Sequence, residues 1–156
     1  EGMFYLVLDY PRFQKVRPYV TNDIKSYIDI MTAETKERFA SDAALSISWT
    51  EVIKRAQTRE AFVKSYPKSN RVTQVKALYQ LYLSISMNGL NNTPMFDYVS
   101  KKIDPEAKAA LKAAVSKGNP VTSGYLKRIK GFLDVVNKNN DTLTPEVRNY
   151  INSALK

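Results

Sequence analysis

The sequence predicts an all-α protein, a compact bundle of about seven helices packed around one central buried helix at about residues 70–90. That stretch is the longest apolar run without a proline, and from Ala77 onward apolar side chains fall on almost every side of a helix. Such a helix is usually surrounded by other helices. Several flanking segments carry a one-sided apolar stripe, and short turns with capping residues join them. A charged residue at Leu81 or Tyr82 is therefore expected to unfold the protein.

Length and composition fit one domain. The chain has 156 residues, of which 44% are hydrophobic and 25% charged, as in an ordinary globular protein that can bury a core. We therefore expect residues 1–156 to form a single helical domain. No stretch approaches the roughly 20 apolar residues that a membrane-spanning helix needs.

The N-terminal segment, residues 1–20, lacks a helical pattern. Residues 3–8 are an unbroken apolar run, and prolines 11 and 18 interrupt regular structure. The chain begins with Glu1-Gly2, which favours a segment trimmed from an anchor or a signal. We expect irregular structure here.

Two long helices and a short one are expected between residues 21 and 66. Thr21 or Asn22 can cap the first, and residues 40–47 are too short and mixed for more than a short helix. Ser48 to Glu51 matches the capping box S-x-x-E, which begins the next long helix. The expected buried positions of these helices are Ile24, Tyr27, Ile28, Met31, Trp49, Val52, Ile53, Ala56, Phe62, Val63 and Tyr66.

The remaining helices have recognisable starts. Asn70 is the expected cap of the central helix, and another helix covers residues 123–138. Three further starts share a capping oxygen placed before a proline, whose missing N–H has no partner at that position anyway. These starts are Thr93-Pro94, Asp104-Pro105 and Thr144-Pro145. The expected buried positions are Ala107, Ala110, Leu111, Ala114, Val115, Leu126, Ile129, Leu133, Val136, Val147, Tyr150, Ile151 and Ala154.

The residue types that are missing limit the chemistry. The chain has no histidine and no cysteine, which excludes most hydrolytic triads, thiolate nucleophiles and nearly all zinc or iron sites. Its five glycines are scattered, so no phosphate-binding loop is present. The polar loop 137–141 contains a lysine and lacks the later glutamate of a calcium loop. We expect no metal, no cofactor and no catalytic residues.

Tyrosine and arginine gather near the N-terminus in the pattern of an interface hot spot: Tyr10, Arg12, Arg17 and Tyr19. This pattern favours a non-enzymatic interaction module, an adaptor that binds a protein partner. The absence of cysteine and the abundance of Lys, Asn, Ser and Tyr favour an exported, envelope-associated protein of a bacterium, outside the cytoplasm.

Positive charge is unevenly distributed, which supports a second hypothesis. Residues 1–50 carry six basic and seven acidic groups (6 − 7 = −1), whereas residues 51–156 carry eighteen and eight (18 − 8 = +10). A basic face over residues 51–138 would suit an anionic polymer or nucleic acid. The candidate contacts on it are Lys101, Lys102, Lys127, Arg128 and Lys130.

A third hypothesis is a lysozyme-like glycan hydrolase, because a basic helical domain without histidine still has carboxylates for acid–base chemistry. Glu51, Glu60 and Glu106 are the glutamates within reach of the helical core. Each has a competing structural explanation, and no second carboxylate is placed by spacing to complete a catalytic pair.

Overall fold

A computed structural model describes residues 8–156, so the expected apolar run at residues 3–8 lies outside the described residues except for Leu8. The described residues form seven α-helices, which confirms the all-α class and the predicted number of helices. The helices are α1 (Tyr10–Phe13), α2 (Asn22–Lys36), α3 (Trp49–Ser65), α4 (Val72–Asn88), α5 (Pro105–Lys117), α6 (Gly124–Lys138) and α7 (Pro145–Ala154). The shorter elements are the 3-10 helix η1 (Arg17–Tyr19) and the strands β1 (Ala40–Ser41), β2 (Ala44–Leu45), β3 (Gly89–Leu90) and β4 (Thr93–Pro94).

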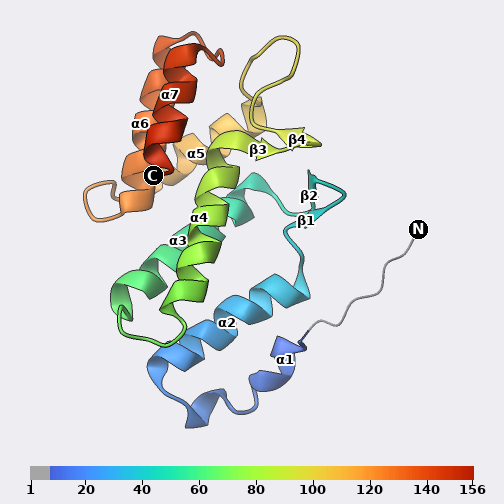
Figure 1. The fold of residues 1–156 in the computed structure, drawn as a ribbon, viewed down its shortest axis with the longest axis vertical. Coiled ribbons are helices and arrows are strands. Elements are labelled where there is room, and N and C mark those ends of the chain that lie inside the picture. The colour runs from blue at the N-terminus through green and yellow to red at the C-terminus, as the bar shows by residue number, and fades with distance from the viewer. Residues whose placement is uncertain (1–7) are drawn as a thin grey trace.

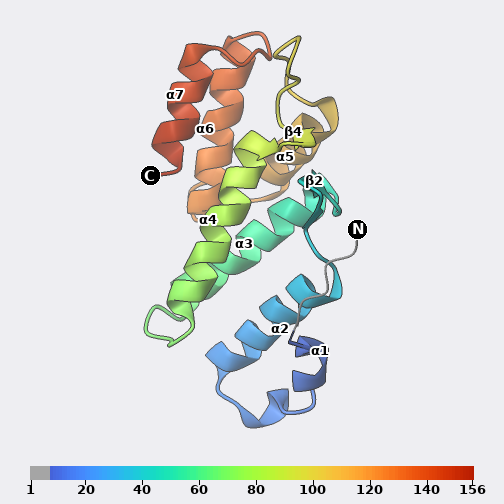
Figure 2. The same ribbon diagram turned by 45° about the vertical axis from the view of Figure 1, so that its right-hand side comes forward.

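The helices α3 and α4 form an antiparallel pair through the middle of the molecule (Figure 1). On one side α5 packs against α3, α6 packs against α5 and α4, and α7 packs against α6. At the opposite end α2 lies beside α3 and carries α1 and η1, as the turned view also shows (Figure 2). The segment 8–20 and the loop 95–104 therefore lie at opposite ends of the molecule.

The central helix α4 is buried along most of its circumference, as predicted. Its buried residues reach two apolar clusters, a main core shared with α3, α5, α6 and α7, and a smaller one with α2. One strip remains in solvent, where Leu81 is 37% exposed. The exposure of Leu81 therefore does not support the expectation that charge at this position unfolds the protein. The buried residues of α4 are Val75, Tyr79, Tyr82, Leu83, Ile85, Ser86 and Met87.

Most of the predicted core positions are buried, which confirms the helical stripes. The exceptions lie at the edges of stripes and are half-buried. These exceptions are Ile24, Met31, Val63, Tyr66, Ala110, Ala114, Val115, Tyr150 and Ala154.

Residues 40–47 form the hairpin β1–β2 and not the expected short helix. Its turn residues Asp42 and Ala43 have φ of 47° and 54°, a left-handed conformation that a helix cannot contain. The hairpin also binds the second hairpin, because the Ala43 carbonyl accepts from the Asn92 N–H at 2.9 Å. Tertiary contacts thus outweigh the weak local preference of this stretch.

The expected helix start at Thr93-Pro94 is wrong as well, because these residues form β4 and pair with β3. Thr93 Oγ1 accepts from the Leu45 N–H at 3.0 Å and caps no helix. The sharp turn out of α4 depends on Gly89, which has a φ of +70°. A Cβ there would lie 2.4 Å from the Met95 nitrogen, so only glycine fits.

The caps of five other helices agree with the predictions in part. Ser48, Asp104 and Thr144 accept hydrogen bonds from backbone N–H groups three residues later, as predicted. In contrast, Thr21 caps α2 without a side-chain bond, and Arg71 stands at the start of α4 where Asn70 was expected.

Candidate functional site

The segment 8–20 is fixed on α2 by polar contacts along one of its sides. The Arg17 guanidinium donates to both carboxylate oxygens of Asp29, with Nε–Oδ1 at 2.9 Å and Nη2–Oδ2 at 2.8 Å. Gln14 Nε2 donates to Asp29 Oδ1 and to Thr32 Oγ1. Partial burial raises the pKa of Asp29, but the bonds from Arg17 and Gln14 outweigh it and the net pKa is lowered. Asp29 is therefore a stable anionic anchor for this segment.

The backbone of this segment places residues three apart on the same side. The N–H of Val16 bonds to the Phe13 carbonyl at 3.1 Å, and the N–H of Tyr19 bonds to the Val16 carbonyl at 3.0 Å. In such 3-10 geometry the side chains of residues i and i+3 eclipse. Gln14 and Arg17 therefore share the side that faces α2, while Phe13, Val16 and Tyr19 share another.

Phe13, Val16 and Tyr19 form an apolar ridge exposed to solvent. Tyr19 is 85% exposed, and Phe13 and Val16 are 43% and 46% exposed. A different side of the segment, that of Gln14 and Arg17, is held on Asp29 and Thr32 of α2. Half of the exposed large apolar residues among residues 8–156 lie in residues 8–19. Such clustering marks an interaction surface, because single exposed apolar residues are common but groups are not.

The four predicted contact residues of this segment have different surroundings. Tyr10 is half-buried, with its hydroxyl 3.2 Å from that of Tyr27 and the two rings edge to face. Tyr10 and Arg17 thus hold the segment in place. Arg12 and Tyr19 face solvent, and Arg12 forms an exposed ion pair with Asp9 at 2.7 Å. Phe13 and Val16 were missed, although the spacing of three between residues 13, 16 and 19 was a readable signal.

The predicted basic cluster on α6 does not form one cationic face. Lys130 pairs with Asp134 at 2.7 Å. Arg128 is half-buried, with Nη1 3.4 Å from the Tyr79 hydroxyl. Of the three, Lys127 alone is exposed without an ion pair to any described residue. The nucleic-acid hypothesis therefore loses its densest contact site.

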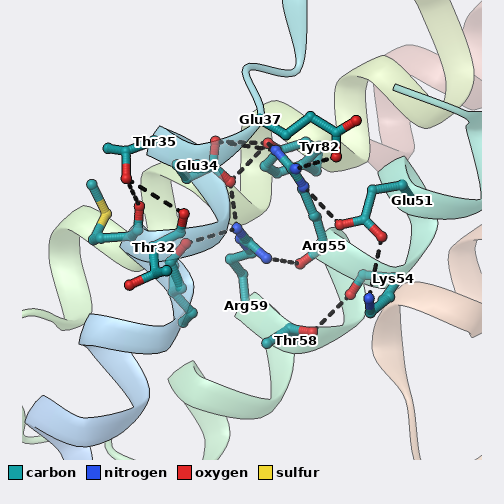
Figure 3. Close-up of polar contacts among 12 residues, drawn as sticks. Thr32, Glu34, Thr35, Glu37, Glu51, Lys54, Arg55, Thr58, Arg59 and Tyr82 are labelled. Atoms are coloured by element: carbon teal, nitrogen blue, oxygen red, sulfur yellow. Dashed lines mark hydrogen bonds and ion pairs between the residues drawn. The ribbon is translucent and has the colours of Figure 1, made fainter. Parts of the chain in front are cut away.

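Two arginines of α3 that contributed to the basic count are buried. Arg55 and Arg59 are each 2% exposed and lie in a network with Glu34 of α2 and Tyr82 of α4 (Figure 3). The Tyr82 hydroxyl donates to Glu34 at 2.7 Å, and Arg55 donates to the Glu51 carboxylate at 3.0 Å. Glu34 also forms an ion pair with Arg59. The network joins three helices, and the guanidinium groups of Arg55 and Arg59 are not exposed to a polyanion.

Lys101 and Lys102, at the other end of the molecule, point in different directions. Lys102 Nζ donates to the Asn140 carbonyl and to Thr142 Oγ1, and so fastens its loop to the loop before α7. Lys101 has a φ of 58° and lines a cavity beside α7. Of this predicted pair, Lys101 lines the cavity beside α7, whereas the Lys102 ammonium already has two acceptors in the protein.

The glutamates of the hydrolase hypothesis are structural. Burial opposes ionisation of Glu51 and Glu60, but hydrogen bonds outweigh it and lower the pKa of both. Glu51 bonds to Arg55, and Glu60 accepts from Ser123 Oγ and from the Tyr125 N–H. A glycosidase acid needs a raised pKa, which is the opposite of what these contacts produce. Glu106 lies exposed in the first turn of α5.

Glu60→Gln is expected to lower the free energy of unfolding by about 1.5–3 kcal/mol near neutral pH, since charged hydrogen bonds to the start of α6 are lost. The folded pKa of Glu60 lies below its usual value of 4.5, so its contribution is complete above that pH. It is lost as pH falls through the folded pKa, and the difference from wild type should then shrink. Urea unfolding at a series of pH values measures this. Glu106→Gln is the control, and a difference that stays constant into strong acid would contradict the assignment.

Within residues 8–156, no group of three acidic residues is arranged to hold a metal ion. No helix in the same range has both the length and the apolar character to cross a membrane. The chain matches no protein-family model, no curated protein and no solved structure. Its function must therefore be inferred from its own surfaces.

Proposed function

We propose that this chain is a protein-binding module, an adaptor without catalytic chemistry, whose docking surface is the apolar ridge of Phe13, Val16 and Tyr19. The observation that carries this proposal is an apolar ridge turned to solvent while the opposite side of the same segment is fixed to Asp29. Because the segment is held by a bidentate ion pair, little conformational freedom is lost on binding.

A protein suits this surface better than a nucleic acid. Aromatic residues and arginine are enriched at the centres of protein interfaces, and here Tyr19 and Phe13 accompany Arg12. The two arginines of the segment already have carboxylate partners, Arg12 in Asp9 and Arg17 in Asp29. A polyanion would have to displace both, whereas an apolar groove on a protein need not.

Site-specific photo-crosslinking tests the proposal. A photoreactive residue at Val16 is expected to give a discrete protein adduct in cells that naturally produce the chain. The same residue at Val121, which is 92% exposed on the loop before α6, is the matched control and should give none. Excess unlabelled wild-type chain should suppress the adduct at Val16.

The decisive variant is Phe13→Ser/Tyr19→Ser. As a competitor it should be at least about tenfold weaker than wild type, because hot-spot side chains carry most of the binding free energy. Its unfolding midpoint should change little, since Tyr19 is largely exposed and the partly exposed Phe13 packs on the ring of Tyr10 at the surface. Equal competition by this variant, or crosslinks to nucleic acid only, would contradict the proposal.

A further inference from the structure

A cavity of about 270 Å³ lies between the end of α4, the loop 95–104 and α7. Part of its lining is apolar and consists of Leu90, Phe96, Leu143 and Ile151. The other part is polar and includes two cations that come from elements far apart in the sequence, Lys101 and Arg148. A cavity that combines an apolar wall with a few convergent polar groups is the usual form of a ligand site.

The two cations have no anion of their own. The guanidinium of Arg148 makes no hydrogen bond or ion pair with any described residue. Lys101 Nζ donates to the Tyr98 carbonyl at 2.6 Å, which occupies one of its three donors. A guanidinium without a partner beside a cavity is suited to a bidentate carboxylate.

Asp97 is the one carboxylate in the lining, and its own loop occupies it. Asp97 Oδ1 accepts from the N–H groups of Val99 and Ser100, at 3.0 and 2.6 Å, and from Ser100 Oγ at 2.8 Å. These bonds lower the pKa of Asp97 and fix the turn. Asp97 Oδ1 therefore shapes the loop, and because Asp97 is anionic while Lys101 and Arg148 are cationic, the lining keeps a net charge of 2 − 1 = +1.

The mouth of the cavity is tied to the neighbouring hairpin and presents further contact surface. The Tyr98 hydroxyl donates to the Asn91 carbonyl at 2.8 Å, which ties the loop to the β3–β4 hairpin. Next to it Val99 is 90% exposed, and Tyr98 itself is 60% exposed. A ligand anchored in the cavity would continue across these side chains, as a polypeptide does.

We propose that this cavity binds a carboxylate of a partner polypeptide together with the apolar side chain next to it. Arg148 and Lys101 receive the carboxylate, and Leu143 and Ile151 receive the side chain. The volume lies below the roughly 300–1,000 Å³ of typical small-molecule sites, so it accommodates one or two residues of a chain. The carboxylate is either the C-terminus of the partner or an internal acidic side chain. This site is separate from the apolar ridge.

Nuclear magnetic resonance titration of the full chain tests this inference, with the methyl groups of Leu143 and Ile151 as reporters. The probes are acetyl-Gly-Gly-Leu with a free carboxylate, the same peptide amidated, an amidated peptide with an internal Asp-Leu pair, and inorganic phosphate. Saturable shifts are expected with the free carboxylate or the internal aspartate, and the tighter of the two identifies the source. The neutral amidated peptide should bind at least about tenfold more weakly.

Arg148→Gln should weaken binding of the preferred peptide about ten- to a hundredfold, and Arg148→Lys should lie between it and wild type, since lysine keeps the charge but loses the bidentate geometry. Lys127→Gln removes the same charge from a surface outside the cavity and is the matched control. The inference is overturned if the amidated peptide binds equally well, if Arg148→Gln changes nothing, or if phosphate competes as strongly as the peptide. The variant Phe13→Ser/Tyr19→Ser should leave this titration unchanged. The test of the cavity and the test of the apolar ridge can therefore fail separately.

Discussion

Replacing Glu34 with glutamine is expected to lower the free energy of unfolding by about 3–5 kcal/mol, because it leaves buried arginines without their shared anion. Glu34 accepts from the Tyr82 hydroxyl with both oxygens, at 2.7 and 2.8 Å, and forms an ion pair with Arg59. Arg59 is the most dependent on it, since its other acceptors are backbone carbonyls and its Nε has no hydrogen-bond partner among residues 8–156. Burial lowers the pKa of Arg59, and the negative charge of Glu34 acts against that lowering. Urea unfolding at neutral pH measures the loss.

The matched control is Glu37→Gln. Glu37 comes within 3.7 Å of Arg55 from the same end of α2, but its side chain is 62% exposed, so its loss should cost less than about 1 kcal/mol. The double change Glu34→Gln/Arg59→Met should recover part of the stability, because it removes the unpaired buried charge. Equal effects of Glu34→Gln and Glu37→Gln would contradict the role assigned to the network.

This network also shows where the sequence misleads. Glu51, Arg55 and Arg59 are four residues apart on α3 and therefore share one side of the helix. Charged residues are seldom fully buried, so the sequence favoured a solvated basic surface for these arginines. Their burial depends on Glu34, and its proximity results from the packing of α2 on α3, which no local pattern contains.

The helices themselves were predictable because their signals are local. An apolar stripe and a capping oxygen act within one or two turns. Both identified α3, α5 and α7, and the stripe identified α6. The hairpins were not predictable, because each two-residue strand depends on the other hairpin: Asn92 bonds to Ala43, and Thr93 bonds to Leu45. A capping oxygen before a proline therefore begins α5 at Asp104, whereas the same sequence pattern at Thr93 lies in a strand.

The two candidate sites also differ in how far the sequence alone predicts them. The segment 10–19 stood out by composition, and the structure adds the geometry that turns Tyr19 outward and Arg17 inward. Arg148 had no signal in the sequence, because a single arginine on an amphipathic helix resembles any other surface charge. Arg148 becomes a candidate contact only in the folded chain, where Lys101 of the loop 95–104 lines the same cavity. Surfaces made by segments far apart in the chain require the fold.

Leu83→Asp is expected to unfold the protein or cost more than about 4 kcal/mol, whereas Leu81→Asp should cost about 1 kcal/mol or less. The two leucines are two positions apart on α4, yet Leu83 is 1% exposed and Leu81 is 37% exposed. At position 83 the carboxylate would enter the main apolar core, while at position 81 it would remain in water. The pair is matched in residue type, helix and charge, so local helix propensity is nearly the same for both.

Thermal and urea unfolding of both variants measure the difference, and far-ultraviolet circular dichroism shows whether Leu83→Asp folds at all. If it does not, Leu83→Ala provides a measurable alternative, with an expected loss of about 2–5 kcal/mol from the cavity it leaves. Similar losses for Leu81→Asp and Leu83→Asp would mean that α4 is enclosed on all sides, as its sequence alone suggests. A large difference would establish that the central helix has one free strip, on which a polar residue is tolerated.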